Sequence, residues 1–331
     1  MPEIFGNTRA IRWGILATGK IATTFARDLR LVDDCTLGAV GSRSLETAQR
    51  FASEHGAERA YGSYDELVAD PDIDIIYVAT PHGRHLQDVM RCFRAAKAVL
   101  CEKALALNAS QARTLIDEAR AHKLFFAEAM WMRCNPNIRR IQEMVGAGAC
   151  GTVGQLRAEL GFVADPGSAR LWDPMLGASA LLDVGIYPLT FANLILGPPQ
   201  SISAAGAISD RGIDISGGAT LTYGSGAVAS IAWTQMAWSD NRAAVSGDGG
   251  RIEIEPRMHE AHSFTYARYT ELDAIAEPIL GQGYAHEIAE VNRCMRAGLI
   301  ESDLLPLDGT LAVMEQMDEI RQQLGVRYAS D

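Results

Sequence analysis

The chain has 331 residues, of which 48% are hydrophobic and 21% charged, and it carries a formal net charge of −11. This composition is typical of a globular protein and excludes a disordered or fibrous one, and the length predicts two domains. The negative charge, with Lys and Arg scattered along the sequence, argues against nucleic acid as a partner. A phosphate-bearing cofactor would therefore need local donors, such as a helix N-terminus or a single arginine.

Neither the cysteines nor the N-terminus indicate a secreted or membrane protein. The six cysteines, at positions 35, 92, 101, 134, 150 and 294, show no Cys-x-x-Cys spacing, so we expect reduced and mostly buried thiols. The first ten residues lack the apolar stretch of a signal peptide, and no run of 18 uninterrupted apolar residues occurs. We therefore expect a cytoplasmic protein that does not span a membrane.

The N-terminal part of the chain alternates short apolar runs with segments of helical period, which predicts parallel strands joined by helices. Right-handed crossovers place the helices on both faces of such a sheet and the ligand site beyond the carboxyl ends of its strands. We therefore expect an α/β Rossmann domain over residues 1–128. Its predicted strands are 11–16, 36–41, 73–79, 98–101 and 124–127, and its predicted helices lie near 20–32, 44–54, 82–95 and 108–121.

Residues 129–331 show another pattern, with apolar and polar residues alternating between Gly-rich turns, as in 218–223 and 226–233. This alternation predicts an α+β domain with an open mixed or antiparallel sheet. We leave open whether its C-terminal helices pack back on the first domain. The helices predicted here are 178–195, 283–297 and 308–324, the second of them ended by Gly298.

A glycine-containing turn directly follows the first predicted strand. Ala17, Gly19 and Ala22 occupy the three small positions of a dinucleotide-binding turn, although Ala17 departs from the usual glycine. Gly19 leaves room for a pyrophosphate, and the N-terminus of the next helix offers N–H groups to it. The alternative is an ordinary tight turn. On the first interpretation the cofactor is bound by Ala17, Thr18, Gly19, Lys20 and Ile21.

The second strand leads into Ser42, Arg43 and Ser44, where an NAD enzyme would carry an acid for the ribose hydroxyls. No acid is present. A forked guanidinium between two hydroxyls suits a 2′-phosphate, so the sequence favours NADP(H). The alternative for Arg43 is a solvated loop arginine.

Further polar side chains follow the next two strands, at the edge where the nicotinamide would lie. His82 and His85 have a spacing that two metal ligands could share, but no further ligand completes a set, so we expect no metal. Lys103 follows an apolar strand and is preceded by a carboxylate. The residues assigned to this part of the cofactor groove are Thr80, Pro81, His82, His85, Glu102 and Lys103.

Asp183 and Tyr187 are four residues apart and so share one face of a predicted helix. A buried tyrosine often makes only a structural hydrogen bond, which is the alternative here. Reducing a carbonyl requires a proton donor at the developing alkoxide, and a free tyrosine is too weak a base for the reverse reaction near neutrality. A lysine ammonium close to the phenolate would stabilise its charged form. We therefore predict that Tyr187 transfers the proton with the help of Lys103.

Four motifs now stand in order: the glycine turn, Cys101–Ala104, Glu128–Arg133 and Asp183–Tyr187. With them the chain resembles the Gfo/Idh/MocA oxidoreductase family over almost its whole length, and within it the branch of dimeric dihydrodiol dehydrogenases and NADP-dependent D-xylose dehydrogenases. The resemblance implies an active site between the two domains and homodimers formed through the second sheet. It also implies that Lys103 and Tyr187 are the catalytic pair and that Asp183 supports them. Ala104 replaces the proline that the family usually has.

The predicted function is hydride transfer between NADP(H) and a small polyhydroxylated substrate, such as an aldose, a keto-sugar or a trans-dihydrodiol. The alternatives are a non-catalytic NADP(H)-binding sensor and a redox-assisted glycoside hydrolase on the same fold. Trp131 and Arg133 are also assigned to the cofactor. Aromatic and charged groups suit sugar-like ligands, so the substrate pocket is predicted to be lined by Trp131, Arg133, Asp165, Trp172 and Asp173.

Overall fold

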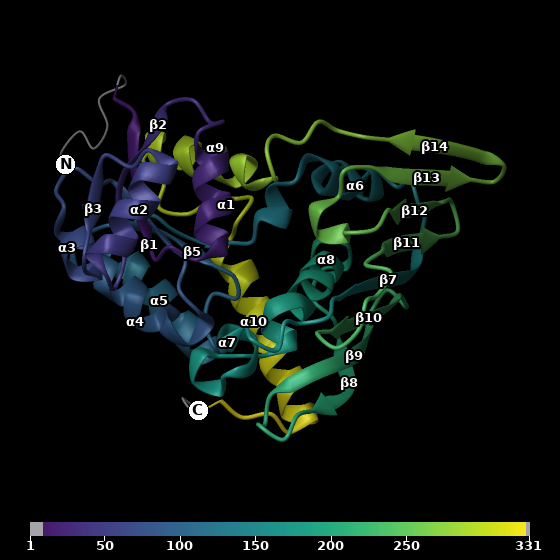
Figure 1. The fold of residues 1–331 in the computed structure, drawn as a ribbon. Coiled ribbons are helices and arrows are strands. Elements are labelled where there is room, and N and C mark those ends of the chain that lie inside the picture. The colour runs from purple at the N-terminus through teal and green to yellow at the C-terminus, as the bar shows by residue number, and fades with distance from the viewer. Residues whose placement is uncertain (1–8, 329–331) are drawn as a thin grey trace. The chain divides into compact units, whose positions relative to one another are not determined.

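The computed structural model describes residues 9–328, and the chain divides into two compact units (Figure 1). The first unit contains the described residues up to Ala106 together with Ser110–Cys134 and Leu280–Thr310. The second contains Leu107–Ala109, Asn135–Ile279 and the described residues from Leu311 onward. Each unit is built around one sheet, and each is described below by itself.

The sheet of the first unit has six parallel strands in the order β3-β2-β1-β4-β5-β6. The order reverses between β1 and β4, which is the switch point where doubly wound sheets bind ligands. The predicted parallel Rossmann sheet is therefore confirmed. Its strands are β1 (Ile11–Leu16), β2 (Cys35–Gly41), β3 (Arg59–Tyr61), β4 (Ile75–Val78), β5 (Ala98–Glu102) and β6 (Phe126–Ala129).

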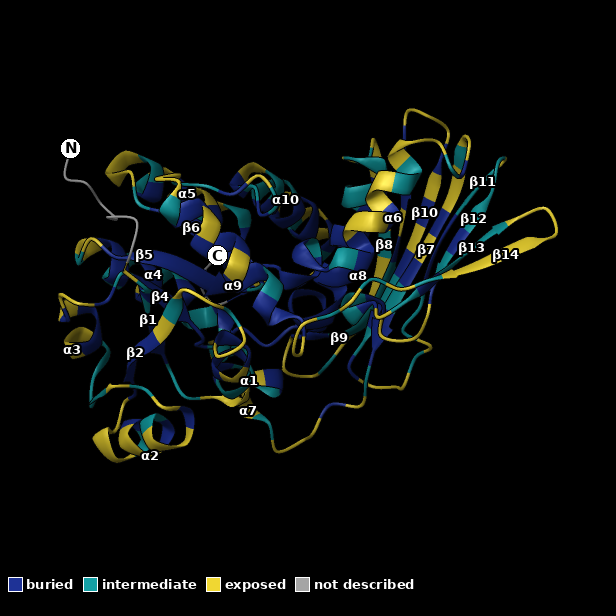
Figure 2. Ribbon diagram, turned by 90° about the horizontal axis from the view of Figure 1, so that it is seen from above, coloured by how far each residue is buried: buried dark blue, intermediate teal, exposed yellow. Residues whose placement is uncertain are grey.

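The four helices predicted for this region are present, with ends shifted by at most a few residues. Figure 2 shows β5 buried along its length, whereas α2 and α5 carry exposed residues. The prediction missed β3 and the short α3, because neither has the long apolar run on which it relied. The helices are α1 (Lys20–Leu29), α2 (Leu45–His55), α3 (Tyr64–Ala69), α4 (His82–Arg94), α5 (Ala109–His122), η1 (Trp131–Cys134) and α9 (Tyr284–Arg296).

Helix α9 is far from α1 in sequence but packs against it. The Trp13 indole of β1 donates a hydrogen bond to Asn292 Oδ1 of α9 at 3.0 Å. Beside it, the Phe25 ring of α1 stacks on the Tyr77 ring of β4, with centroids 3.7 Å apart. As predicted, Gly298 ends α9 in the left-handed conformation, with φ of 67°. The Leu280–Thr310 segment is therefore part of the Rossmann core.

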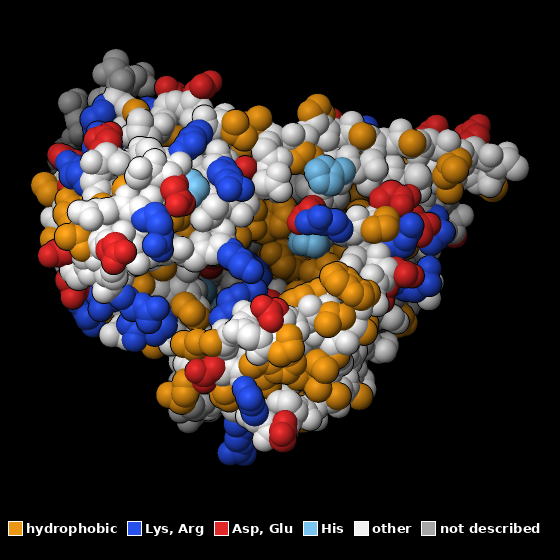
Figure 3. Space-filling model, in the orientation of Figure 1, with side chains coloured by type: hydrophobic (Ala, Val, Ile, Leu, Met, Phe, Trp, Pro, Cys, Tyr) orange, Lys and Arg blue, Asp and Glu red, His pale blue; other side chains and the backbone are white. Residues whose placement is uncertain are grey.

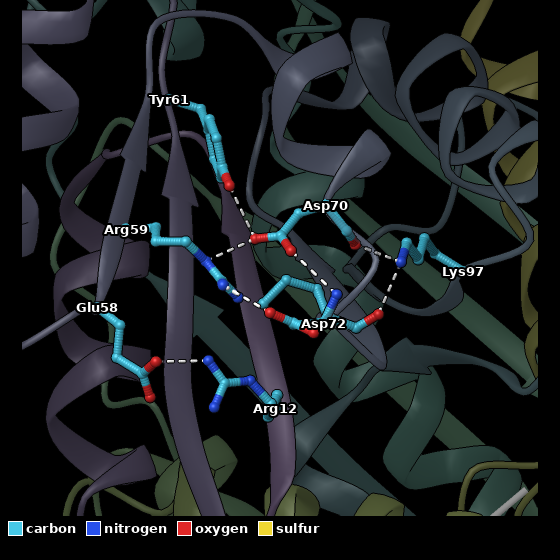
Figure 4. A network of polar contacts seen from close by, with 8 residues as sticks. Arg12, Glu58, Arg59, Tyr61, Asp70, Asp72 and Lys97 are labelled. Atoms are coloured by element: carbon cyan, nitrogen blue, oxygen red, sulfur yellow. Dashed lines mark hydrogen bonds and ion pairs between the residues drawn. The ribbon is translucent and has the colours of Figure 1, made fainter.

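Ion pairs and hydrogen bonds connect β3 with the segments that precede β4 and β5 (Figure 4). Asp70, before β4, forms an ion pair with Arg59, with 2.8 Å between Nε and Oδ2, and accepts a hydrogen bond from the Tyr61 hydroxyl at 2.9 Å. The Lys97 ammonium, just before β5, donates to the carbonyls of Asp70 and Ile73 at 2.6 and 2.8 Å. These contacts join the strand β3 to the segments before β4 and β5, so we assign them a structural role.

The second unit holds an eight-stranded sheet in the order β14-β13-β12-β11-β7-β10-β9-β8. Strands β7 and β10 are parallel, and the other neighbouring pairs are antiparallel. The predicted mixed sheet is confirmed. Its strands are β7 (Val153–Gly161), β8 (Ser201–Ile208), β9 (Asp214–Thr222), β10 (Val228–Thr234), β11 (Ala243–Gly247), β12 (Arg251–Ile254), β13 (Phe264–Arg268) and β14 (Glu271–Ile275).

The helix predicted over 178–195 is a π-helical turn, η3 (Leu181–Gly185), that continues as α8 (Ile186–Leu196). Trp233 of β10 packs beneath it, and a Cβ added to Gly217 would lie only 2.3 Å from the Trp233 ring. Pro174–Leu196 is long and apolar enough to cross a membrane, but most of it is buried, as in a core helix. The other helices are α6 (Pro136–Gly146), which was not predicted, α7 (Ala169–Trp172), η2 (Pro174–Leu176), η4 (Met258–Glu260) and α10 (Leu307–Leu324).

The structure shows the state of the cysteines and the distribution of charged side chains on one face of the molecule. All six cysteines are free, and five of them are buried, as expected. Figure 3 shows Lys and Arg scattered among acidic and neutral side chains on the face it presents, without a continuous basic stripe.

Candidate active site

The glycine turn forms an open cradle at the carboxyl end of β1. Gly19 is the N-cap of α1, and a Cβ built there would meet no atom within 4 Å. No side chain among the described residues caps α1, and Ala22 is fully buried against the strand side. Ala17 has a φ of 86°, a conformation that favours glycine. A phosphate at this helix N-terminus would meet backbone N–H groups without steric obstruction.

The loop after β2 lies beside this cradle. The Ala17 N–H donates to Gly41 O at 3.0 Å, and the Thr18 and Ser42 hydroxyl oxygens are 3.5 Å apart. Arg43 is exposed at the end of this loop. Ser44 caps α2 by accepting from the Thr47 N–H at 3.4 Å. The predicted phosphate-binding residues therefore come together on one side of the first unit.

The two histidines hold loops in place at the same edge. His85 is fully buried, with ring nitrogens 2.9 Å from Ala104 O and 2.7 Å from Thr80 O. The His82 Nε2 atom lies 3.1 Å from Lys103 O. Burial lowers the pKa of His85, although these backbone contacts oppose that shift. His85 thus has no exposed surface with which to line a groove, and Pro81 serves as the N-cap of α4.

Glu102 and Lys103 end β5. Glu102 is buried, and its carboxylate accepts from the Tyr77 hydroxyl and, at 3.2 Å, from the Lys103 N–H. Lys103 is half-buried and is joined to Ala104 by a cis peptide bond. The strand end is therefore fixed by its own carboxylate, with the lysine directly beyond it.

The Glu128–Arg133 motif, which begins in β6, is also held by contacts within the first unit. Glu128 accepts from the Leu105 N–H and from the Thr310 hydroxyl, both at 2.9 Å. Burial lowers the pKa of the Arg133 guanidinium, and the Glu128 charge opposes this shift. The Trp131 ring is buried and stacks on Tyr284, with centroids 4.8 Å apart. Two of the assigned cofactor residues, Trp131 and Arg133, thus lie next to the β5 and β6 ends.

Asp183 and Tyr187 lie in the second unit, on the helical segment that begins in η3. Both are buried, at 7% and 5% exposure, and Arg170 Nη1 contacts Asp183 Oδ1 at 2.9 Å. The start of the segment is held by Asp214, which accepts from the Ser179 hydroxyl and the Leu181 N–H. The sequence prediction that Asp183 and Tyr187 share a helix is confirmed. Lys103 belongs to the first unit, so its pairing with Tyr187 stays a prediction.

The other assigned pocket residues make local contacts. Asp165 accepts from the Gly167 N–H at 2.9 Å, and Asp173 from the Met175 N–H at 2.9 Å. The Trp172 indole donates to Asp165 O at 3.0 Å. These bonds shape the loop that carries Arg170, and a role in substrate binding stays a prediction.

The sequence analysis did not identify His259, although its ring packs on Tyr187 with centroids 5.1 Å apart. Its Nε2 atom is 3.4 Å from Glu260 Oε1, and Arg257 pairs with the same carboxylate. Burial alone would raise the pKa of Glu260, but His259 and Arg257 together lower it. A single histidine in the short helix η4 gives no local signal, because only the fold brings it to Tyr187.

Comparison with known families agrees with this geometry. Residues 11–129 match the Gfo/Idh/MocA model described as an oxidoreductase family with an NAD-binding Rossmann fold, and residues 138–253 match the Gfo/Idh/MocA C-terminal domain. The chain belongs to the Gfo/Idh/MocA oxidoreductase family. The trans-1,2-dihydrobenzene-1,2-diol dehydrogenase of Xenopus tropicalis is 36% identical over 96% of this chain and 99% of its own length. The human enzyme of that name is 32% identical over 97% and 99%.

Solved structures of the family share the fold. A 3-ketoreductase from Actinomadura kijaniata, crystallised with NADP and TDP-benzene, is 25% identical, with a TM-score of 0.87 over 96% of this chain and 98% of its own. An aldose-aldose oxidoreductase from Caulobacter crescentus, complexed with glycerol, has a TM-score of 0.87 at 24% identity, over 95% and 97%. This family member is therefore an oxidoreductase with an NAD(P)-binding Rossmann domain.

Proposed function

We propose that this protein transfers a hydride between NADP(H) and a CH–OH carbon of a small polyhydroxylated substrate, such as an aldose, a keto-sugar or a trans-dihydrodiol. The observation that carries the proposal is the open cradle at Gly19, with Arg43 on the adjoining loop and no acid where NAD enzymes place one. The curated relatives named as dihydrodiol dehydrogenases support the substrate class.

The residues around the cradle fit a dinucleotide. The N-terminus of α1 would receive the pyrophosphate, and the Arg43 guanidinium with the Ser42 hydroxyl would bind a 2′-phosphate. Glu102 and Lys103 would lie toward the nicotinamide, because they end β5 at the carboxyl edge. When bound, the nicotinamide supplies or accepts the hydride.

Tyr187 would give a proton to the carbonyl oxygen during reduction and take it back during oxidation. Lys103 would stabilise the phenolate form, since a nearby cation favours the charged state. Asp183, held by Arg170 one helical turn before Tyr187, would fix the position of this part of the helix. These three roles follow the family resemblance.

We also propose a cytoplasmic homodimer formed through the second sheet. Strand β10 supports the interface, because exposed Val228 and Ser230 alternate with buried Ala229 and Ile231. One face of this strand therefore belongs to the core, and the other is open to a second copy of the chain.

The proposal is tested by following nicotinamide absorbance with NADP+ or NADPH and a panel of aldoses, keto-sugars and trans-dihydrodiols, with NAD+ and NADH in parallel. We expect turnover with one substrate class and a preference for the phosphorylated cofactor. Tyr187→Phe should lower kcat by about 100-fold or more, because general acid catalysis contributes on this scale, and should leave the Kd of the cofactor unchanged.

The control variant is Tyr223→Phe, which removes a buried hydroxyl elsewhere in the second unit. Turnover of Tyr187→Phe at the wild-type rate would contradict the assigned proton donor. Tight cofactor binding without turnover on any substrate would favour a sensor.

A further inference from the structure

Four carboxyl groups are buried together in the first unit, on four different elements. They are Asp28 of α1, Glu102 of β5, Glu128 of β6 and Glu287 of α9, and each is less than 10% exposed. The charge on Glu287 is influenced by each of the other three and in turn influences Tyr77 of β4. Such a concentration of buried acids requires either donors for every carboxylate or protons on some of them.

Three of the four acids have donors. Asp28 accepts from the N–H groups of Gln282, Tyr284 and Ala285 at 2.9 to 3.2 Å. Glu102 accepts from the Tyr77 hydroxyl and the Lys103 N–H, and Glu128 from Leu105 and Thr310, as described above. These hydrogen bonds satisfy all three carboxylates, although burial raises the pKa of Glu128.

Glu287 differs from the other three. It is fully buried, and neither of its carboxyl oxygens has a hydrogen-bond partner among the described residues. Burial, followed by the charges of Glu102, Asp28 and Glu128, raises its pKa well above the ordinary value. An ionised carboxylate would be strongly disfavoured at such a position, so burial and the neighbouring acids favour the protonated form of Glu287.

The position of Glu287 relative to the expected nicotinamide site links its charge to the oxidation state of the cofactor. Glu102 ends β5 at the carboxyl edge of the sheet, where the nicotinamide ring would lie, and its charge acts on Glu287 of α9. The oxidised ring carries a positive charge and the reduced ring carries none. Only the oxidised ring would therefore lower the cost of ionising Glu287.

We propose that Glu287 is a positioning residue that is neutral in the free protein and beside the reduced nicotinamide, and that releases its proton to solvent when the oxidised nicotinamide binds. This inference rests on the proposed function, because it requires a nicotinamide dinucleotide at the β5 edge. By linkage, raising the pH strengthens binding of the oxidised cofactor relative to the reduced one. The buried acids thus favour the oxidised form, which makes the bound reduced form a stronger hydride donor.

The decisive measurement is the pH dependence of cofactor affinity in the full-length protein without substrate. The Kd of NADPH is measured by its fluorescence and that of NADP+ by competition, from pH 6 to pH 9. In the wild type, the ratio of the NADPH Kd to the NADP+ Kd should rise by about tenfold, the size expected for one unit charge acting across a protein interior. In Glu287→Gln, the ratio should stay constant with pH.

Glu290→Gln is the matched control, because Glu290 lies on the same helix and is buried but is paired with Arg293 and Ser302. It should keep the wild-type pH dependence. The infrared spectrum of the free protein at pH 7 should contain a protonated-carboxyl band that Glu287→Gln lacks and Glu290→Gln retains. Calorimetry in two buffers of different ionisation enthalpy should show proton release on NADP+ binding and none on NADPH binding.

The outcomes separate this inference from the proposed function. If nicotinamide dinucleotides bind but Glu287→Gln keeps the wild-type pH dependence, the inference is overturned and the proposed function stands. If NADP+, NADPH, NAD+ and NADH all fail to bind, the inference and the proposed function are both overturned. Absence of the infrared band from the wild-type protein would also overturn the inference, whatever the affinities.

Discussion

Ala17 is the residue at which this chain departs from the usual dinucleotide-binding turn, and its backbone adopts a conformation that favours glycine. Its φ of 86° lies in a region where a Cβ is strained and glycine is not. We therefore expect Ala17→Gly to raise the free energy of unfolding by about 1 kcal/mol, after the greater freedom of glycine in the unfolded chain is included. Chemical denaturation at constant pH measures this difference.

Ala22→Gly is the control for that substitution. Ala22 lies in the first turn of α1 and is fully buried, so glycine there should lower the free energy of unfolding by about 1 kcal/mol, through lost helix propensity and lost packing of the methyl group. If Ala17→Gly raises the free energy of unfolding and Ala22→Gly lowers it, the gain at Ala17 comes from relieved backbone strain and not from a general effect of glycine. Equal destabilisation by both variants would contradict the strain at Ala17.

The location of candidate residues at the carboxyl edge of the first sheet was predictable where the signal is local. Gly19, Arg43 and Glu102 each follow a recognisable strand, and the fold of parallel strands brings them to one edge. His259 and Glu287 were missed because their significance depends on contacts with residues distant in the sequence. Nothing in the neighbouring sequence distinguishes Glu287 from the solvated acids of other helices.

Helices and strands were also predictable from local signals, whereas the distant contacts that hold them were not, and α9 is an example. Its helical period and its end at Gly298 were predicted, but its N-terminus is capped by Asp28 of α1, which no sequence pattern indicates. Strand β3 was missed because it has only three residues, all half-buried. In the second unit the π-helical turn of η3 was missed, because the sequence pattern predicts one continuous helix over 178–195.

Because Asp28 satisfies the first N–H groups of α9, its loss should destabilise that helix. We expect Asp28→Ala to lower the free energy of unfolding by about 2 kcal/mol, the upper range for a helix cap, since the carboxylate is buried and accepts several bonds. Asp28→Asn, which keeps one oxygen acceptor, should cost less. The exposed Asp117→Ala in α5 should change the value by less than about 0.5 kcal/mol.

Hydrogen exchange can localise the effect of Asp28→Ala. Amides of α9 should exchange faster, while those of β8 and β9 in the second unit should be unchanged, because the lost contacts lie within the first unit. A variant as stable as the wild type, with unchanged exchange in α9, would show that Asp28 does not hold this helix.

For the molecule as a whole, the sequence predicted both sheets and the family, because these depend on long regular patterns. The return of Leu280–Thr310 to the first unit could not be derived from them. That return creates the buried acid cluster, since α9 brings Glu287 to the acids of α1, β5 and β6. The pH dependence of stability is thus set by a segment far along the chain from the motifs.

Glu287 gives that pH dependence a definite sign. Its folded pKa is raised, so the folded protein holds a proton that the unfolded chain releases near the ordinary glutamate value of about 4.3. Stability is therefore lost as the pH rises from that value toward the folded pKa, by at most about 1.4 kcal/mol per pH unit. We expect Glu287→Gln to be more stable than the wild type at pH 8, and the difference to shrink at pH 5.

Glu290→Gln should behave differently in the same denaturation series. Burial alone would raise the pKa of Glu290, but Arg293 and Ser302 lower it, so its stabilising contribution is present above about pH 4.3 and lost only in acid. Its replacement should therefore lower stability by a constant amount between pH 5 and pH 8. A difference between Glu287→Gln and the wild type that does not change with pH would show that the buried carboxyl is already ionised in the folded protein, and that another group supplies its counter-charge.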